Sequence, residues 1–226
     1  MKKNILTLAL IFFISSNFVN AQKFSFGAKF SPLASWSKVS NTDFYNYEND
    51  EFKVGVGFGP SLKIKMSDSF NTEIGAIFTW QGTQFNQTPI SMNPDSSMNY
   101  ETKLQYLQIP VIFEGQFKIA KKLSAAINFG AIPSVSLSSL VDVKNNVTGD
   151  MIATDHDFSA SMFNLFLSAG AGTYFEFTDG VSLSTIILYN NGVIDVWYDK
   201  SNAEYIKTLD MKNHYISLNI GLHIDF

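Results

Sequence analysis

Hydrophobic and polar residues alternate along most of the chain with a period of two. In NHYISLNIGLHIDF, residues 213–226, the even positions from Ile216 to Phe226 are apolar, and the odd positions are mainly polar or small. The stretch EFKVGVGFGPSLKIKM, residues 51–66, alternates in the same way. A period of two predicts strands with two different faces, whereas an amphipathic helix would repeat about every 3.6 residues.

Eight stretches of this kind can be found, and the lengths of the connections between them alternate. The expected strands span 23–35, 51–66, 70–83, 100–118, 123–137, 160–177, 181–194 and 210–226. Short connections lie near 67–69, 119–122 and 178–180, and long polar ones near 36–50, 84–99, 138–159 and 195–209. An even number of long strands with alternately short and long connections is typical of outer-membrane barrels. The sequence therefore predicts an all-β, eight-stranded, antiparallel up-and-down transmembrane β-barrel in the lipid bilayer of the outer membrane, with both termini in the periplasm.

Aromatic residues on the expected lipid face gather near the two ends of the strands. Those near the short turns are Phe24, Phe70, Phe117, Phe177 and Phe226, and those near the long loops are Trp36, Trp80, Tyr100 and Tyr189. Two aromatic girdles are what the two membrane interfaces favour. A soluble exported barrel would also alternate, but it would bury its apolar row. The other row is rich in Gly, Ser and opposed charges, which suits the narrow lumen of a membrane barrel.

The N-terminus reads as an export signal. Lys2 and Lys3 precede an apolar stretch from Ile5 to Ile14, and Val19-Asn20-Ala21 fits a cleavage site. We therefore expect a signal peptide at residues 1–21 and a barrel domain at residues 22–226. The rest of the chain has no apolar run long enough for a transmembrane helix.

Composition narrows the range of functions. The chain has no cysteine, which excludes disulfides and thiolate chemistry. All 16 basic residues are lysine and the net charge is -4. Arginine forks are the usual means of recognising phosphates and base edges, so the composition argues against a nucleic-acid partner.

Charged residues also occur in the row expected to face the lumen. They are Lys53, Lys63, Lys65, Glu73, Glu114, Lys118, Glu176, His223 and Asp225. They could line a polar channel, or they could neutralise one another in a packed lumen, because unpaired buried charges are costly. Eight strands leave room for little more than side chains, which favours the packed lumen.

The stretch YLQIPVIFEGQF, residues 106–117, resembles the hallmark strand of the PorT-like outer-membrane β-barrel family of Gram-negative bacteria. The resemblance extends over essentially the whole mature chain, and it implies an outer-membrane barrel with no catalytic residues. The founding type is tied to maturation and secretion of exported proteins. A terminal aromatic such as Phe226 resembles the insertion signal read by the barrel-assembly machinery.

Because Pro110 cannot donate a ladder hydrogen bond and the apolar period slips nearby, we expect a bulge near Tyr106–Ile109, beyond which Pro110 and Glu114 point inward.

Other candidate chemistry is weak. Asp155, His156 and Asp157 are metal-ligand types, but adjacent residues cannot all reach one ion without a special turn. The acidic segment YENDE, residues 47–51, lacks the spacing of a calcium loop. The glycine repeats lack the order of a phosphate-binding loop. We expect no cofactor and no metal.

These observations favour a non-enzymatic outer-membrane scaffold that displays four long external loops to a surface or secretion partner. The loop aromatics that could anchor such a partner, or pack among themselves, are Tyr45, Tyr47, Trp197, Tyr198 and Tyr205. One alternative is a narrow porin-like conduit. A second is an enzyme active at the rim, with His214 or His156 working beside a loop aspartate.

Overall fold

The computed structural model describes residues 24–40, 45–49, 51–90, 97–158, 160–196 and 211–226. The expected signal peptide lies outside these residues and remains a prediction. The described strands are β1 (Phe24–Val39), β2 (Tyr45–Asn49), β3 (Lys53–Lys65), β4 (Phe70–Gly75), β5 (Ile77–Pro89), β6 (Met98–Gln108), β7 (Val111–Ala120), β8 (Leu123–Asn145), β9 (Met151–Asp157), β10 (Phe163–Thr178), β11 (Val181–Gly192) and β12 (Met211–Asp225). No helix among the described residues is long and apolar enough to cross a membrane.

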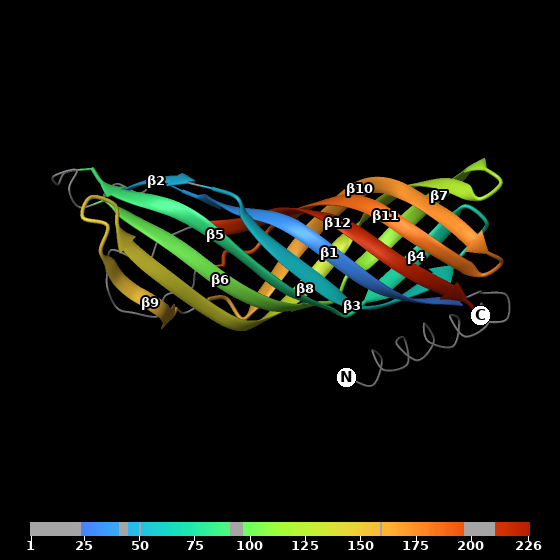
Figure 1. Ribbon diagram of the computed structural model, residues 1–226, viewed down its shortest axis with the longest axis horizontal. Coiled ribbons are helices and arrows are strands. Elements are labelled where there is room, and N and C mark those ends of the chain that lie inside the picture. Colours follow the sequence, from blue (N-terminus) through green and yellow to red (C-terminus); the bar gives the residue numbers. More distant parts are fainter. Residues whose placement is uncertain (1–23, 41–44, 50, 91–96, 159, 197–210) are drawn as a thin grey trace, which may run out of the picture.

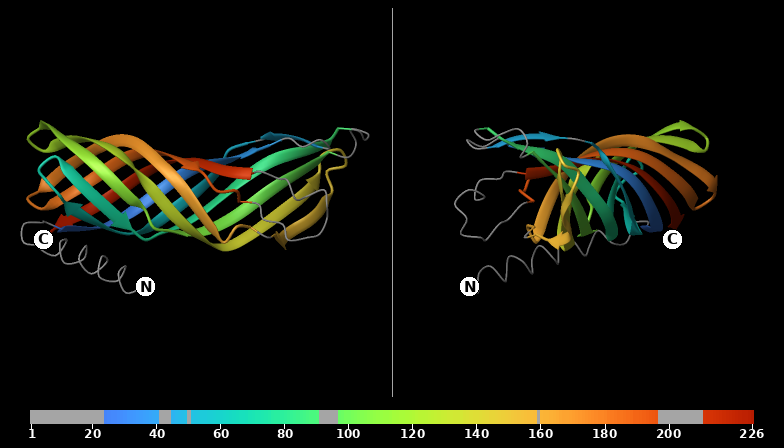
Figure 2. Two further views of the ribbon diagram at one scale, coloured as in Figure 1. Left: turned by 180° about the vertical axis from the view of Figure 1, so that it is seen from behind. Right: turned by 60° about the vertical axis from the view of Figure 1, so that its left-hand side comes forward.

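The strands close into a ring of eight antiparallel spans (Figures 1 and 2). In order around the ring, the spans are β1, β3, β4 with β5, β6 with β7, β8, β10, β11 and β12. The ring closes where β12 pairs with β1, from Ser25↔Asp225 to Val39↔Met211. The last span therefore has a partner on each side, and the predicted eight-stranded antiparallel topology is confirmed.

Two of the predicted strands are each interrupted at one point. The predicted strand 70–83 breaks at Ala76, whose amide donates to the carbonyl of Pro60 at 3.1 Å. The predicted strand 100–118 breaks at Ile109 and Pro110, where the amide of Ile109 donates to the carbonyl of Pro133 at 2.8 Å. Proline has no amide to donate, which accounts for the second break.

The short connections lie where the sequence predicts them. The turn between β7 and β8 consists of Lys121 and Lys122, and that between β10 and β11 of Asp179 and Gly180. Gly180 has a φ of 82°, a left-handed conformation that glycine adopts without a Cβ clash. The beginning of β1 and the end of β12 lie at this same end of the barrel, to the right in Figure 1.

The opposite end contains more strand than the sequence predicts. The predicted loop at 36–50 contains β2, and that at 138–159 contains the end of β8 and all of β9. β2 extends the sheet beside β5, and β9 folds back on β8. The expected long loops are thus partly a continuation of the barrel wall, drawn at the left of Figure 1.

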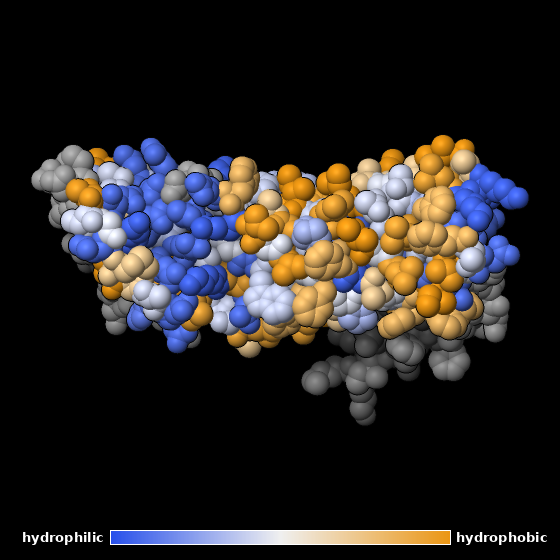
Figure 3. Space-filling model, viewed as in Figure 1, coloured by the Kyte–Doolittle hydropathy of each residue, from blue (hydrophilic) through white to orange (hydrophobic). Residues whose placement is uncertain are grey.

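The outer surface divides into two zones (Figure 3). The half that contains the short turns carries exposed apolar side chains, among them Phe30 at 52% exposed, Ile127 at 58% and Ile187 at 58%. The half near the long connections is mainly polar. An apolar zone that encircles a molecule is far larger than a soluble monomer exposes, and it matches the lipid-facing band of a membrane barrel.

The predicted bulge in the fourth strand is wrong, although the predicted inward orientation of Pro110 and Glu114 is confirmed. Leu104 and Tyr106 are buried in the lumen at 1% and 0% exposed, on the same row as Pro110 and Glu114. The even residues of β6 and β7 thus face inward on both sides of the break. The register shift lies opposite, where Gln105 pairs with Ser138 but Tyr106 pairs with Ser136, so that β8 carries the extra residue. The prediction failed because it assigned large apolar side chains to the lipid face, whereas this lumen also needs them as filling.

One member of the predicted aromatic girdles is likewise misplaced. Tyr100 lies on the inward row of β6 and stacks on Phe85, with ring centroids 5.2 Å apart and an interplanar angle of 7°. Trp80 and Tyr189 are on the outer surface as expected, at 37% and 44% exposed. Trp36 also lies on an outward row, stacked between Tyr189 and His214.

Candidate functional site: the filled lumen and the loop-end extension

The middle of the lumen is filled by large side chains. Leu33, Ile112, Ile132, Phe166 and Tyr215 form one buried cluster, each at most 5% exposed. These residues come from β1, β7, β8, β10 and β12, so the cluster spans the ring from wall to wall. The cavity beside it measures only about 30 Å³, room for about one or two water molecules. The described lumen is therefore packed at this level and does not form an open pore.

A buried ionic network lies on the short-turn side of this cluster. The ammonium group of Lys63 is 3.3 Å from Glu114 and lies over the ring of Tyr174, 3.5 Å from its centroid. Glu114 also accepts hydrogen bonds from the amides of Asn71 and Asn128, both at 3.1 Å, and from the hydroxyl of Tyr174. With four donors on one carboxylate, the charge of Glu114 is fully compensated without water.

A second ion pair joins Lys29 to Glu73, and the side chains of both residues are less than one-tenth exposed. The predicted neutralisation of the lumen charges is therefore confirmed for Lys63, Glu73 and Glu114. The partner Lys29 was missed, although it lies on the inward row of β1 between Gly27 and Ser31. Its position on that row could have identified Lys29 as a residue that faces the lumen.

The remaining predicted lumen residues lie nearer the ends of the barrel. Lys118, Glu176 and Asp225 are exposed at the short-turn mouth, and Lys65 pairs there with Asp68 at 2.9 Å. Together with Lys121 and Lys122 they line a polar cavity of about 260 Å³. Lys53 lies toward the other end and pairs with Glu101. The predicted charged residues thus form separate groups along the lumen rather than one continuous polar channel.

His223 belongs to the buried zone. Its Nε2 is 3.0 Å from the hydroxyl of Ser184, and its Nδ1 is buried without a hydrogen-bond partner. A Cβ on Gly221 would lie 2.6 Å from the Ser184 hydroxyl oxygen and 2.8 Å from His223 Nε2, so a larger residue there would displace one of the two side chains. A serine and a histidine in contact resemble part of a nucleophilic triad, but no carboxylate of the described residues forms an ion pair with this imidazole.

The two histidines proposed for rim catalysis have different surroundings. His214 stacks against Trp36, with centroids 6.0 Å apart, and its Nδ1 is buried without a partner. His156 lies on β9 opposite Val141 and is exposed. No carboxylate among the described residues forms an ion pair with any of the three histidines. The described residues therefore contain no assembled triad.

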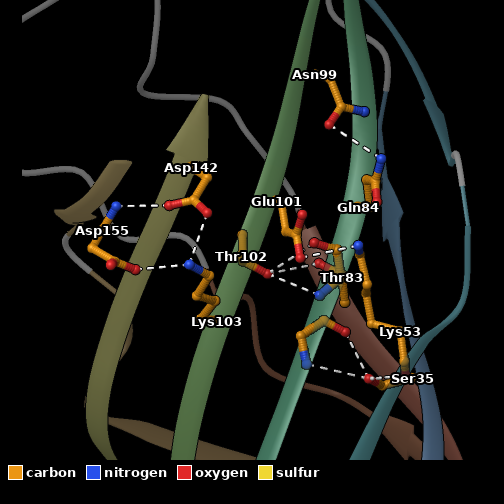
Figure 4. A network of polar contacts seen from close by, with 11 residues as sticks. Ser35, Lys53, Thr83, Gln84, Asn99, Glu101, Thr102, Lys103, Asp142 and Asp155 are labelled. Atoms are coloured by element: carbon orange, nitrogen blue, oxygen red, sulfur yellow. Dashed lines mark hydrogen bonds and ion pairs between the residues drawn. The ribbon is translucent and has the colours of Figure 1, made fainter. Parts of the chain in front are cut away.

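The wall at the loop end carries a polar network on its outer side (Figure 4). Lys103 lies 2.7 Å from both Asp142 and Asp155, which joins β6, β8 and β9. The amide of Asp155 donates to Asp142 at 2.7 Å. Asp155 has a φ of 49°, and its contacts with Asp142 and Lys103 hold this left-handed conformation in place.

The charges in this network shift one another's protonation. The backbone amide of Asp155, followed by Lys103, lowers the pKa of Asp142. The hydrogen bonds that Lys103 donates to Asp142 and then to Asp155 raise the pKa of Lys103. Asp155 thus serves as a partner of Lys103. Separately, the described residues contain no group of three or more His, Asp or Glu that could hold a metal ion.

The candidate partner anchors fall into two groups. Tyr47 packs edge-on against Phe85 at 6.1 Å and accepts a hydrogen bond from Gln87 at 3.3 Å. Burial, followed by the influence of Tyr100 and Tyr45, raises the pKa of Tyr47 to about 12. Tyr45 lies beside Tyr47 at 6.4 Å. Both rings pack within the structure. Trp197, Tyr198 and Tyr205 lie outside the described residues.

Several exposed apolar residues at the loop end lie on the β8–β9 hairpin. Val147 is 54% exposed, Met151 is 53% and Ile152 is 55%. Asn145 caps the turn, accepting hydrogen bonds from the amides of Val147 and Thr148 at 2.8 and 3.1 Å. The hairpin thus presents apolar side chains on an ordered support beyond the lipid-facing zone.

Comparison with known proteins agrees with this architecture. The sequence model of a family described as "Outer membrane protein beta-barrel domain" matches residues 20–180. Among solved structures, the outer membrane protein OprG from Pseudomonas aeruginosa aligns with a TM-score of 0.50 at 9% identity, covering 90% of this chain and 96% of that one. Neisserial surface protein A aligns with a TM-score of 0.46 at 13% identity, covering 90% and 97%. The outer membrane protease OmpT from Escherichia coli aligns with a TM-score of 0.49 at 9% identity, covering 90% and 97%.

At 9% identity the alignment with OprG supports a shared fold and shows nothing about activity. The comparison with curated proteins gives no match to this sequence.

Proposed function

The chain belongs to the outer membrane protein β-barrel domain family, and from this premise we propose that it is a non-enzymatic scaffold that displays its long connections at the cell surface. The short turns then lie in the periplasm, as is usual for such barrels. The observation that carries the proposal is the contrast between the two parts of the barrel. The lumen is packed across its middle, while the wall continues beyond the apolar zone as an ordered polar extension.

The β8–β9 hairpin is the contact surface that the structure favours. Its exposed Val147, Met151 and Ile152 differ from Tyr45 and Tyr47, whose rings pack inside the extension. A surface or secretion partner would bury the three apolar side chains, and such residues form the anchors of many interfaces.

Site-specific photo-crosslinking in intact outer membranes tests this role. A photoreactive residue at Val147 or Ile152 should give a discrete macromolecular adduct. The matched control is Phe117, which is also exposed, at 55%, but lies near the short turns. Identical adducts from Val147 and Phe117, or none from the hairpin positions, would contradict the scaffold role.

A narrow conduit is the competing function, and bilayer conductance separates the two. The packed cluster around Phe166 and Tyr215 should prevent steady ionic current through the described lumen. Large, stable conductance steps from the purified chain would overturn the packed-lumen scaffold in favour of the conduit.

We also propose the finer family assignment, to the PorT-like barrels, and with it a link to protein export. Its support is the stretch of residues 106–117, in which Tyr106 packs edge-on against Phe166 at 6.4 Å and Glu114 holds the buried ionic network. A strain that lacks the protein should then deliver fewer exported proteins to the surface. Unchanged delivery would remove this assignment.

Recognition by the barrel-assembly machinery is a further proposal. Phe226 is 80% exposed beside β12, and its amide donates to the carbonyl of Phe24 at 2.8 Å. Deletion of Phe226 should reduce the folded protein in outer membranes more than Tyr45→Ala does. Equal membrane levels of the two variants would contradict the proposal.

A further inference from the structure

Two lysines face each other on neighbouring strands, at the edge of the apolar zone that is nearer the long connections. Lys38 of β1 pairs directly with Lys212 of β12 in the antiparallel register. Both lie on outward rows, since their neighbours Ser37 and Asn213 are buried inside. Like charges directly opposite each other on a sheet destabilise it. The fold itself gives no reason for this pairing.

The outward row of β12 shows where the membrane ends. Ile216, Leu218, Ile220, Leu222 and Ile224 follow one another at every second position. This run covers nine residues by numbering, from 216 to 224, which fits the roughly 9–11 residues that a tilted strand needs to cross the hydrocarbon. The next outward positions are His214 and then Lys212, so Lys212 lies just above the hydrocarbon boundary.

An aromatic layer separates the lysines from the apolar run. Trp36 pairs with His214 across the strands, and the two rings stack at 6.0 Å. Tyr189 stacks on Trp36 at 6.1 Å. Aromatic side chains of this kind lie at the level of the glycerol and headgroup region of a bilayer. The order apolar, aromatic, basic therefore follows the order of chemical groups in a leaflet.

The two lysines place two positive charges opposite each other at this level of the barrel wall. His214 lies two positions from Lys212 on the outward row of β12, and its cross-strand partner Trp36 lies two positions from Lys38. Among the described residues, Asp195 lies 3.7 Å from Lys212, and Lys38 forms no ion pair. Both lysines thus lie at a position that faces the headgroups.

We propose that Lys38 and Lys212 together bind the phosphate of an anionic lipid in the leaflet that meets the long-loop end. A phosphate oxygen between the two ammonium groups removes their repulsion, and the acyl chains lie against Trp36, Ala34 and Ile216 below. Each lysine near an anionic membrane surface contributes about a fivefold gain in binding, corresponding to about 1 kcal/mol. The pair thus selects anionic over zwitterionic lipid by about 25-fold.

Quenching of Trp36 by brominated lipids reports occupancy of this site. The full chain with Trp80→Phe and Trp197→Phe retains Trp36 as the only tryptophan. It is folded into vesicles of phosphatidylcholine that contain brominated phosphatidylglycerol or, at the same fraction, brominated phosphatidylcholine. The anionic quencher should quench Trp36 more strongly, and Lys38→Gln/Lys212→Gln should abolish the difference. Equal quenching by the two lipids, or a preference that survives in the double variant, would overturn the proposal.

The matched control removes two lysines elsewhere on the same barrel. Lys121→Gln/Lys144→Gln changes the net charge equally, at two exposed positions outside this site, and should leave the preference intact. Loss of the preference in this control would assign it to overall charge and also overturn the proposal.

Stability provides a readout that is independent of fluorescence. In pure phosphatidylcholine the variant Lys38→Gln/Lys212→Gln should unfold at a higher urea concentration than the parent chain, because a repulsion has been removed. In vesicles that contain phosphatidylglycerol this order should reverse. A variant with the same rank in both lipids would contradict phosphate binding.

Discussion

In the half of the barrel near the short turns, Lys63 and Glu114 form their ion pair inside the lumen, whereas near the long connections Lys103 pairs with Asp142 and Asp155 on the outside. The side chains of the first pair are 9% and 1% exposed, while that of Lys103 is 45% exposed. The chemical groups are the same in both halves. What differs is the medium outside the wall, which is lipid in one half and water in the other.

This difference in medium determines how much each ion pair contributes to the stability of the fold. In the membrane half, charges must face inward, where removal of one partner leaves the other without water. In the loop half, water solvates either partner if the other is lost, so the pair there mainly holds a local conformation. Lys–carboxylate pairs at similar distances therefore have different importance in the two halves.

The largest expected effect comes from Glu114→Leu. This change leaves Lys63 buried without its carboxylate, and should destabilise the folded barrel by about 3–5 kcal/mol. Urea unfolding in lipid vesicles measures the free energy. The control is Lys63→Met/Glu114→Leu, which removes both charges and should recover most of the loss. A double variant as unstable as the single one would show that the charge of Lys63 is not the cause.

The second effect concerns the outer surface. Ile187→Lys puts a charge on an outward position of the apolar zone, where Ile187 is 58% exposed, and should cost about 2–4 kcal/mol. Gln105→Lys, on the outward row at the loop end, should change stability by less than about 0.5 kcal/mol. Similar costs at the two positions, measured in the same vesicles, would contradict the division into a lipid zone and a water zone.

A smaller effect is expected for Lys103→Met. Loss of this solvated cation should cost only about 0.2–1 kcal/mol of global stability. Its main effect should be local, because Lys103 joins β6 to the β8–β9 hairpin. Amide hydrogen exchange should be faster in residues 142–157 and unchanged around Glu114. A global loss as large as that of Glu114→Leu would show that the two pairs are equivalent.

The smallest effect is a pH dependence confined to the hairpin. The pKa of Asp142 is lowered in the folded chain, so the stability it contributes is present above its usual value of 3.8 and is lost as the pH falls through the lowered value. Limited proteolysis near Val147 should therefore increase in this acidic range. In the variant Asp142→Asn, the rate of cleavage should no longer change with pH in this range. A wild-type cleavage rate independent of pH would remove this role.

The alternation of side chains was enough to predict the strand number, the short turns and most of the outward row. These features are local, since they depend only on period and turn chemistry. The pairing of Lys29 with Glu73 was not predictable in the same way, because 44 positions separate the two residues and their side chains meet across β3, which lies between β1 and β4 in the sheet. The location of the register shift in β8 rather than β6 likewise depends on how these two neighbouring strands pair.

The apolar residues inside the lumen show the limit most clearly. The sequence by itself determined that the chain forms two-faced strands and that the chain crosses the outer membrane with them. It could not decide that Leu104, Tyr106 and Tyr100 point inward, because a large apolar side chain satisfies a packed lumen as well as it satisfies lipid. The tertiary structure decided this through the space left inside an eight-stranded ring. Ring closure also placed Lys38 opposite Lys212 at the membrane edge, although the two residues are far apart in the chain.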